Sequence, residues 1–146
     1  MFNALLALFK KFGIGFTITL PTGYTKMAKY FSDDEVRGLD HGFIQKLDKA
    51  REIAGIPFII TSGLRSPEKN QSVIGSVPDS AHLKGLAVDL RVTSSRDAAL
   101  IVDAAKAAGI DRRGIYVDSY WNPRHIHLDV DPDKINEVLF VKLEQN

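Results

Sequence analysis

The sequence predicts an α+β domain in which a small, mainly antiparallel sheet carries the functional residues and two principal helices pack against one face. Residues 86–92 and 125–131 each alternate apolar with polar positions, as strands do when only one of their faces is buried. A doubly wound parallel sheet would instead need almost continuously apolar strands. Residues 40–54 and 98–108 have apolar side chains at helical spacing and supply the two helices.

Length and composition limit the possible classes of protein. A chain of 146 residues is expected to form one domain with a hydrophobic core of its own. It contains no cysteine, which excludes a disulfide framework and a thiolate metal site. With 19 basic and 18 acidic residues the net charge is +1, which gives no electrostatic footprint for nucleic acid. We expect a monomer that does not bind a polyanion.

The first 25 residues are expected to form an apolar helix and an arm outside the main domain, which spans residues 26–146. The apolar run at residues 2–9 is too short to cross a bilayer, and its lysines follow it, unlike those of a signal peptide. We therefore expect no stable membrane insertion. A short amphipathic helix packed on the domain is preferred to a contact with a membrane surface. Residues 16–20 alternate apolar side chains with threonines, a pattern typical of an edge strand or an extended arm.

Local signals place the elements before the first motif. Ser32 and Glu35 have the spacing of a capping box, which predicts the start of a helix. The next helix, at residues 40–54, ends at the glycine and proline of residues 55–57. These lead into residues 58–61, a short apolar run that we expect to be a buried strand in the centre of the sheet.

Similar signals place the later elements. Residues 66–68 open a helical turn with proline in its first position, and residues 75–80 form a loop at the border of the predicted cleft. Residues 93–97 cap the second principal helix, and residues 114–117 are a strand candidate. The tail at residues 138–143 fits either a last helix or a strand.

Two short motifs hold three of the four histidines. His82 and Asp89 are seven positions apart where a strand begins, and Gly85 between them can adopt a turn that brings the imidazole back over the carboxylate. Far downstream, one strand face carries His125, His127 and Asp129.

Two such strands in one sheet could bring His82, Asp89 and one of the two late histidines to a single ion. Two imidazoles and one carboxylate with an open position form a catalytic zinc set. The fourth histidine, His41, begins a helix and fits a capping or solvated position better than that of a ligand.

At these residues the sequence resembles the zinc D-Ala-D-Ala metallopeptidases, which share a fold with the hedgehog domains. Residues 80–89 fill every fixed position of that family's pattern Ser-x-His-x-x-Gly-x-Ala-x-Asp, and residues 125–127 fit its later His-x-His. Residues 61–66 are similar to the family's Ser-Gly-Tyr-Arg segment, and residues 114–116 also match. The resemblance covers about residues 30–131. It implies Zn²⁺ as cofactor, with His82, Asp89 and His127 as ligands.

The resemblance also implies a substrate. Members hydrolyse peptide bonds in the stem peptides of bacterial peptidoglycan, as carboxypeptidases or endopeptidases, so the expected site of action is the periplasm or cell wall. The arginine equivalent to Arg65 contacts substrate in the family, and a guanidinium can hold a carboxylate or carbonyl in bidentate geometry. The same resemblance places Ser80 and Tyr116 against the substrate.

The chain departs from the family at one position. Many members carry Asp or Glu three positions before the last ligand, where this chain has Arg124, and a guanidinium cannot act as a base. His125 is the predicted replacement, because it lies two residues before the ligand on the same strand face. Asp129 is the second candidate.

The missing carboxylate leaves other functions open. One is a non-catalytic, zinc-containing module that binds the cell wall, in the manner of the hedgehog domains. Another is a lytic component of a phage or virus.

Overall fold

The computed structural model describes residues 26–144, so the predictions for residues 1–25 lie outside the described part. The elements, in chain order, are α2 (His41–Ala54), β1 (Ile60–Ser62), α3 (Pro67–Gln71), the 3₁₀ helix η1 (Ala81–Lys84), β2 (Ala87–Arg91), α4 (Ser95–Ala107), β3 (Arg112–Val117), β4 (Pro123–Asp129) and β5 (Val138–Leu143). This α+β content confirms the predicted fold class. None of the helices described is long and apolar enough to cross a membrane.

The five strands form one mixed sheet in the order β1-β2-β4-β3-β5. The three pairings β1 with β2, β2 with β4 and β3 with β4 are antiparallel, whereas β3 and β5 are parallel. The sheet is therefore mainly antiparallel, as predicted, but not purely so. The tail, for which helix and strand were both open, is the parallel edge strand β5.

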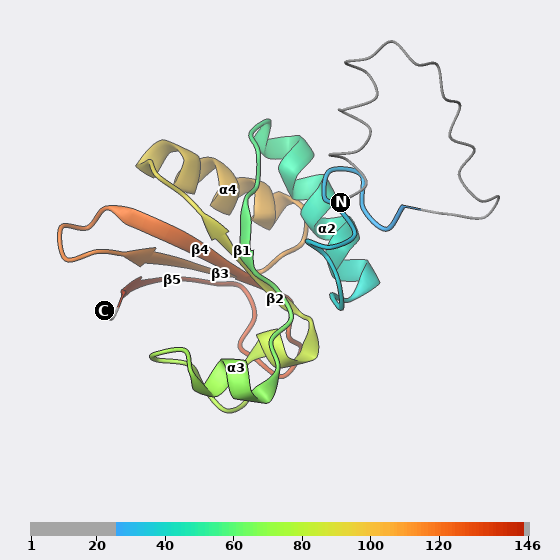
Figure 1. Ribbon diagram of the computed structural model, residues 1–146. Helices are drawn as coiled ribbons and strands as arrows, with labels where there is room; N and C mark the ends of the chain where they lie inside the picture. Colours follow the sequence, from blue (N-terminus) through green and yellow to red (C-terminus); the bar gives the residue numbers. More distant parts are fainter. Residues whose placement is uncertain (1–25, 145–146) are drawn as a thin grey trace, which may run out of the picture.

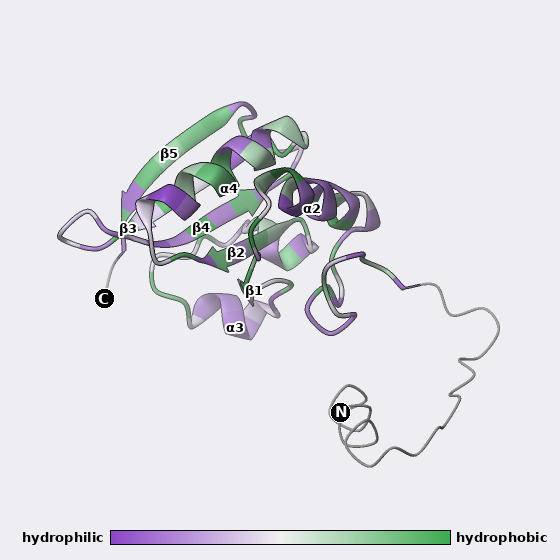
Figure 2. Ribbon diagram, turned by 90° about the horizontal axis from the view of Figure 1, so that it is seen from above, coloured by the Kyte–Doolittle hydropathy of each residue, from purple (hydrophilic) through white to green (hydrophobic). Residues whose placement is uncertain are grey.

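The two long helices cover one face of the sheet, and α3 lies on the other side (Figure 1). Each long helix buries an apolar stripe and exposes polar residues, and hydrophilic segments are visible on both helices in Figure 2. Burial of these stripes against the strands is the main source of stability. The buried core comprises, among others, Phe43, Ile44 and Leu47 of α2, Ile101, Val102 and Ala105 of α4, and Val88, Leu90, Ile126 and Leu128 of the strands.

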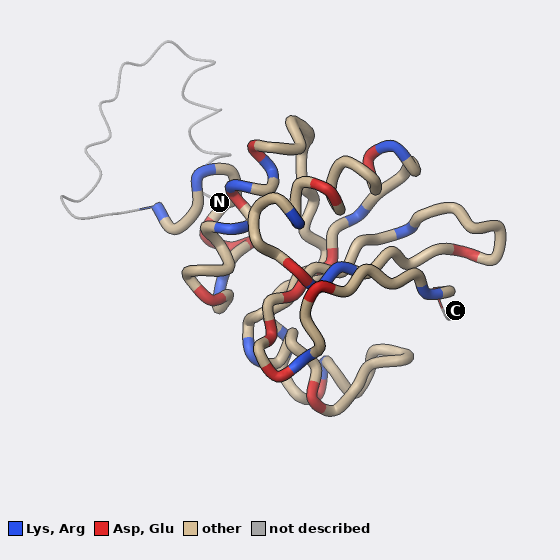
Figure 3. Tube along the Cα trace, turned by 180° about the vertical axis from the view of Figure 1, so that it is seen from behind, with Lys and Arg blue, Asp and Glu red and all other residues tan. Residues whose placement is uncertain are grey.

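Side-chain caps set the helix boundaries that the sequence predicted. The Asp40 side chain accepts a hydrogen bond from the Phe43 amide at 2.9 Å and begins α2, and Gly55 ends it in the left-handed conformation. Ser94 caps α4 in the same way, by accepting from the amide of Asp97 at 3.0 Å. Acidic and basic residues are interspersed along the described chain (Figure 3).

Two expectations about local structure were wrong. The strand predicted at residues 58–61 is not central, because β1 lies at the edge of the sheet and pairs with β2. Phe58 is buried but Ile59 is 43% exposed, so only one face of this segment is covered. Ser32 and Glu35 do form the reciprocal hydrogen bonds of a capping box, yet a series of turns follows them in place of a regular helix.

Candidate active site

His82 is held by the short helix η1 and is 2% exposed. Its Nδ1 lies 2.8 Å from the carbonyl oxygen of Gly63. A carbonyl can only accept, so this contact assigns the proton to Nδ1 and leaves Nε2 with its lone pair. Nε2 is buried without a hydrogen-bond partner and lies 3.3 Å from Oδ2 of Asp89. A buried nitrogen without a partner is costly unless something binds it.

Gly85 makes the turn that brings His82 to the sheet. Its φ is +68°, a conformation that residues with a Cβ rarely adopt. A Cβ at this position would also lie 2.2 Å from the carbonyl oxygen of Gly38. Both requirements are local to the backbone, which explains a glycine between the histidine and the strand that carries Asp89.

Asp89 on β2 lies directly opposite His127 on β4. Its Oδ1 is 2.9 Å from Nδ1 of His127, and its Oδ2 contacts the Arg65 guanidinium. Burial would raise the pKa of Asp89, but the hydrogen bond from His127 opposes that effect and helps to hold the pKa well below its usual range. Asp89 is therefore an anion that faces both imidazoles.

His127 is held between two carboxylates. Besides its contact with Asp89, its Nε2 lies 2.9 Å from Oδ2 of Asp129. Burial alone would lower the pKa of His127, yet the hydrogen bonds to Asp129 and Asp89 raise it to about 9. In the metal-free protein the ring therefore carries a proton on Nδ1, at the atom that faces Asp89.

These three residues fit a metal ion. One potential ligand atom from each of His82, Asp89 and His127 lies within 4.8 Å of the others. Gly63 and Asp129 occupy the opposite ring nitrogens, and such outer hydrogen bonds orient the histidines of metal sites. The unpartnered Nε2 of His82 is the observation that most directly favours a bound cation. The chain contains no cysteine, so a bound metal ion must take imidazole nitrogens and a carboxylate oxygen as ligands, and zinc binds both.

Arg65 reaches the same place from the loop after β1. Its guanidinium contacts Oδ2 of Asp89, and its Nε donates to the hydroxyl of Ser62 at 2.8 Å. Its backbone amide donates to the carbonyl of His82 at 3.1 Å, which ties the loop to η1. The guanidinium therefore lies at the ligand carboxylate, and its predicted role with substrate stays a prediction.

Asp129 lies on the far side of His127 from Asp89 and is 2% exposed. Besides His127 it pairs with Nε of Arg112 at 3.0 Å and accepts from the backbone amide of Asp131 at 3.2 Å. These contacts favour an orienting role for Asp129, and its role as a base stays a prediction. Ser80 caps η1 and accepts from the amide of His82, and its predicted contact with substrate is likewise untested.

His125 lies two residues before His127 on the same face of β4. Its ring stacks on Tyr116 of β3, with centroids 4.2 Å apart and an angle of 16° between the planes. Its Nδ1 lies 3.3 Å from Oε1 of Glu144. Burial lowers the pKa of His125, although the negative charges of Asp89 and Glu144 oppose that shift. A ring that is neutral near pH 7 can accept a proton, as the predicted base must.

Sequence reasoning missed Glu144, which follows β5. No motif marks it, because it belongs to a tail whose secondary structure the sequence left open. Phe140 of β5, which lines the same cleft, was missed for the same reason. The Phe140 ring lies over Gly114, where a Cβ would be 2.3 Å from the ring, and its centroid is 6.5 Å from that of His127.

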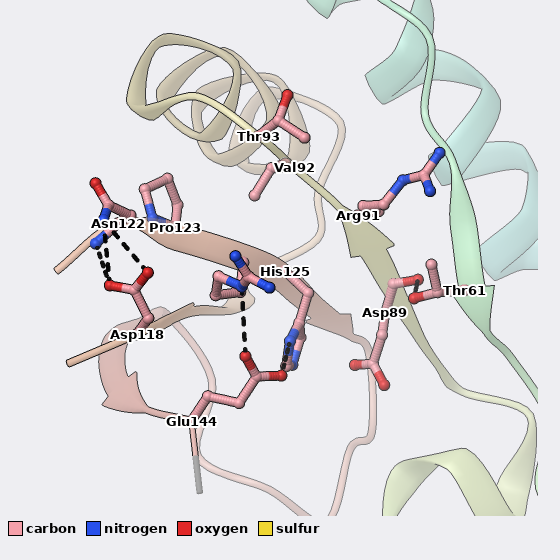
Figure 4. Close-up of a pocket in the computed structure, with 11 residues that line it drawn as sticks. Thr61, Asp89, Arg91, Val92, Thr93, Asp118, Asn122, Pro123, His125 and Glu144 are labelled. Atoms are coloured by element: carbon pink, nitrogen blue, oxygen red, sulfur yellow. Dashed lines mark hydrogen bonds and ion pairs between the residues drawn. The ribbon is translucent and has the colours of Figure 1, made fainter. Parts of the chain in front are cut away.

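Two cavities, of about 640 and 630 Å³, meet at Asp89, His125 and Glu144. The larger contains His82, His127, Arg65, Ser80 and Tyr116, so it joins the predicted ligands to the predicted substrate residues. The smaller extends past His125 toward Asn122 and Thr93 (Figure 4). The cleft therefore has room on both sides of the ligand set.

The mixed sheet and its buried His-Asp-His set, placed in a cleft beside an arginine and a further histidine, are those of a metallopeptidase. The sequence profile of the family Peptidase M15 matches residues 24–129, and the chain belongs to this family. Membership confirms the resemblance to the zinc D-Ala-D-Ala metallopeptidases.

Three chains of solved structures match the fold. One is the L-Ala D-Glu endopeptidase ChiX of Serratia marcescens, with 18% sequence identity and a TM-score of 0.50; the match covers 73% of this chain and 93% of that chain. At this identity the likeness supports the α+β fold alone. Comparison with the curated proteins gives no match.

Proposed function

We propose that the protein is a zinc-dependent peptidase that cleaves peptide bonds in the stem peptides of bacterial peptidoglycan. The observation that carries the proposal is the His82, Asp89 and His127 set, with the buried Nε2 of His82 left without a partner. Membership of the M15 family supports the same reaction class. The periplasm or the cell wall is the proposed site of action, since the substrate is found there.

His82, Asp89 and His127 would hold the zinc, which polarises a carbonyl and acidifies water when it is bound. His125 would accept the proton of the attacking water and return it to the leaving amine. Arg65 would hold a carboxylate or carbonyl of the peptide in bidentate geometry. Burial raises the pKa of Tyr116, so its hydroxyl stays protonated and can donate to the peptide.

We further propose cleavage of the endopeptidase type. A carboxypeptidase needs room for one terminal residue beyond the cut bond, whereas an endopeptidase must hold peptide on both sides. The two cavities that meet at Asp89, His125 and Glu144 each have the volume of a ligand pocket. This extended cleft supports an internal cut, and analysis of the products of defined muropeptides tests it: release of free D-Ala alone would contradict the proposal.

Purified peptidoglycan separates hydrolysis from the second candidate, a non-catalytic module that binds the cell wall. The arginine at position 124, where the resemblance to the zinc D-Ala-D-Ala metallopeptidases implies a carboxylate, favours that candidate. The wild-type protein should release new amino groups from the cell wall, and His82→Ala should not. Binding to the wall without new amino groups in the zinc-loaded wild-type protein would overturn the peptidase proposal and support the module.

A further inference from the structure

The carboxylate of Glu144 is placed to control the orientation of His125. Figure 4 shows the His125 ring directed toward Glu144, and Oε1 of Glu144 is 3.3 Å from Nδ1 of the ring. We propose that Glu144 is a positioning residue of this site, which keeps the proton of His125 on Nδ1 and leaves Nε2 free to exchange a proton in the cleft. The inference rests on the proposed peptidase function.

The backbone of Glu144 is fixed independently of its side chain. Its amide donates to the carbonyl of Val117 at 2.8 Å, which continues the pairing of β5 with β3 beyond Leu143. The carboxylate is thus delivered to the site by the parallel pairing of the edge strand. A change of side chain at position 144 leaves this backbone bond intact, so its effects can be separated from folding.

The chemistry of the contact decides the tautomer. An ionised carboxylate can only accept hydrogen bonds, so a neutral His125 must carry its proton on Nδ1 to bond with Glu144. Stacking on Tyr116 holds the plane of the ring, and the 3.3 Å approach of Nδ1 to Oε1 of Glu144 turns that nitrogen toward the carboxylate. A base whose tautomer and orientation are held by a carboxylate is the arrangement that makes histidine effective in other hydrolases.

No other acidic residue described along the two cavities pairs with His125. Asp89 faces both ligand histidines, and Asp129 is occupied by His127 and Arg112. The remaining two are bonded elsewhere, Asp118 to backbone amides of its own hairpin and Asp79 to Lys134. Glu144 is therefore the carboxylate available to hold this ring.

Arg124 lies near the Glu144 carboxylate, at an irregularity in the pairing of β4 with β3. Tyr116 pairs with His125 but the next residue, Val117, pairs with Pro123, so Arg124 is an extra residue in the strand. Bulges of this kind redirect a side chain, often beside an active site. Nε of Arg124 lies 3.9 Å from Oε2 of Glu144, so its positive charge is near the oxygen that does not contact His125.

The first test reads the tautomer directly. In the zinc-loaded full chain with ¹⁵N-labelled histidine, long-range ¹H–¹⁵N correlation spectra assign the protonated nitrogen of His125, identified by its absence in His125→Ala. We expect Nδ1–H in the wild-type protein, Nδ1–H in Glu144→Gln, whose amide oxygen still accepts, and a shift toward Nε2–H in Glu144→Ala. Glu137→Ala, in the same segment but outside both cavities, is the matched control and should leave the spectrum unchanged. An Nε2–H ring in the wild-type protein, or a tautomer that Glu144→Ala does not change, would overturn the proposal.

The second test is kinetic. We expect Glu144→Ala to lower kcat roughly ten- to a hundredfold with little change in KM and in zinc content, since the residue acts on proton transfer and touches no ligand. Glu144→Gln should recover most of the loss, and Glu137→Ala should retain wild-type kcat. A wild-type kcat for Glu144→Ala would contradict the proposal. If the wild-type protein cleaves nothing while the tautomer still depends on Glu144, the peptidase function fails and the contact between the two residues stands.

Discussion

Nδ1 of His127 lies 2.9 Å from Oδ1 of Asp89, although the two residues are 38 positions apart in the chain. The antiparallel register of β2 and β4 pairs these two positions directly, and η1 brings His82 to the same carboxylate. Each histidine has its other ring nitrogen bonded away from the centre, to Gly63 or to Asp129. One potential ligand atom of each of His82, Asp89 and His127 therefore faces the same point, within 4.8 Å of the other two.

Zinc content should depend on the three converging residues. After zinc loading and removal of excess metal, we expect one equivalent in the untagged wild-type protein and almost none in His82→Ala, because loss of one of three ligands leaves an incomplete site. His41→Ala removes a histidine at the exposed start of α2 and should retain the full equivalent. Elemental analysis by mass spectrometry measures the content. Full zinc occupancy in His82→Ala would exclude it as a ligand.

Hydrolysis should depend on the planar guanidinium of Arg65 and not only on its positive charge. We expect Arg65→Lys to impair hydrolysis nearly as much as Arg65→Ala, with zinc content intact, because lysine cannot form the bidentate contact. Loss of such a contact costs about 2 to 4 kcal/mol, or roughly thirty- to a thousandfold in kcat/KM. Steady-state kinetics with Arg96→Ala as control measure it. Because Arg65 also contacts Asp89, a parallel loss of zinc would show that it supports the metal site and not the substrate.

The substitution Asp129→Asn distinguishes two roles of Asp129, orientation of His127 and general-base catalysis. Since Asp129 bonds the outer nitrogen of His127, we expect zinc affinity to fall roughly tenfold to a hundredfold, as for other outer-shell partners of metal ligands. Competition with a chelator of known affinity gives the measurement, and Asp118→Asn, whose carboxylate bonds within its own hairpin, is the control. Unchanged affinity combined with abolished hydrolysis would instead favour Asp129 as the base.

The stability of the metal-free protein should fall as pH rises from about 6.5 to about 9. The folded protein raises the pKa of His127 from 6.5 to about 9, so protonated His127 stabilises the fold fully below the unfolded value and loses that contribution as pH passes the folded value. Urea unfolding in the presence of a chelator should show this decline, and His127→Gln should reduce its slope. Equal slopes for the two proteins would contradict the assigned contacts of His127.

Gly85→Ala should destabilise the domain more than Gly55→Ala does. Both glycines have positive φ, but a Cβ at Gly55 meets nothing within 4 Å, whereas one at Gly85 would lie 2.2 Å from a backbone oxygen. Positive φ alone costs a residue with a Cβ about 1–3 kcal/mol, and at position 85 the clash is added to it. Urea unfolding at constant pH compares the two. Equal losses of stability would show that the loop at Gly38 moves aside without cost.

The class of fold and the convergence of the two histidine motifs could be predicted from the sequence alone. Alternation with a period of two predicted β2 and β4, helical spacing predicted α2 and α4, and the glycine between His82 and Asp89 predicted their convergence. These inferences succeed because they depend on local backbone geometry and on which face of an element is apolar. The same local information could not place β1, since a short apolar run does not reveal how many neighbours a strand has.

The residues that lie beside His82, Asp89 and His127 could not be predicted in this way. The approach of Glu144 to His125 depends on the parallel pairing of β5 with β3, which is not visible in the periodicity of the chain. The position of Arg65 at Asp89 likewise depends on the path of a loop that packs on η1. Contacts of this kind join segments far apart in sequence, so their geometry follows from the packed sheet and not from any one segment's own preferences.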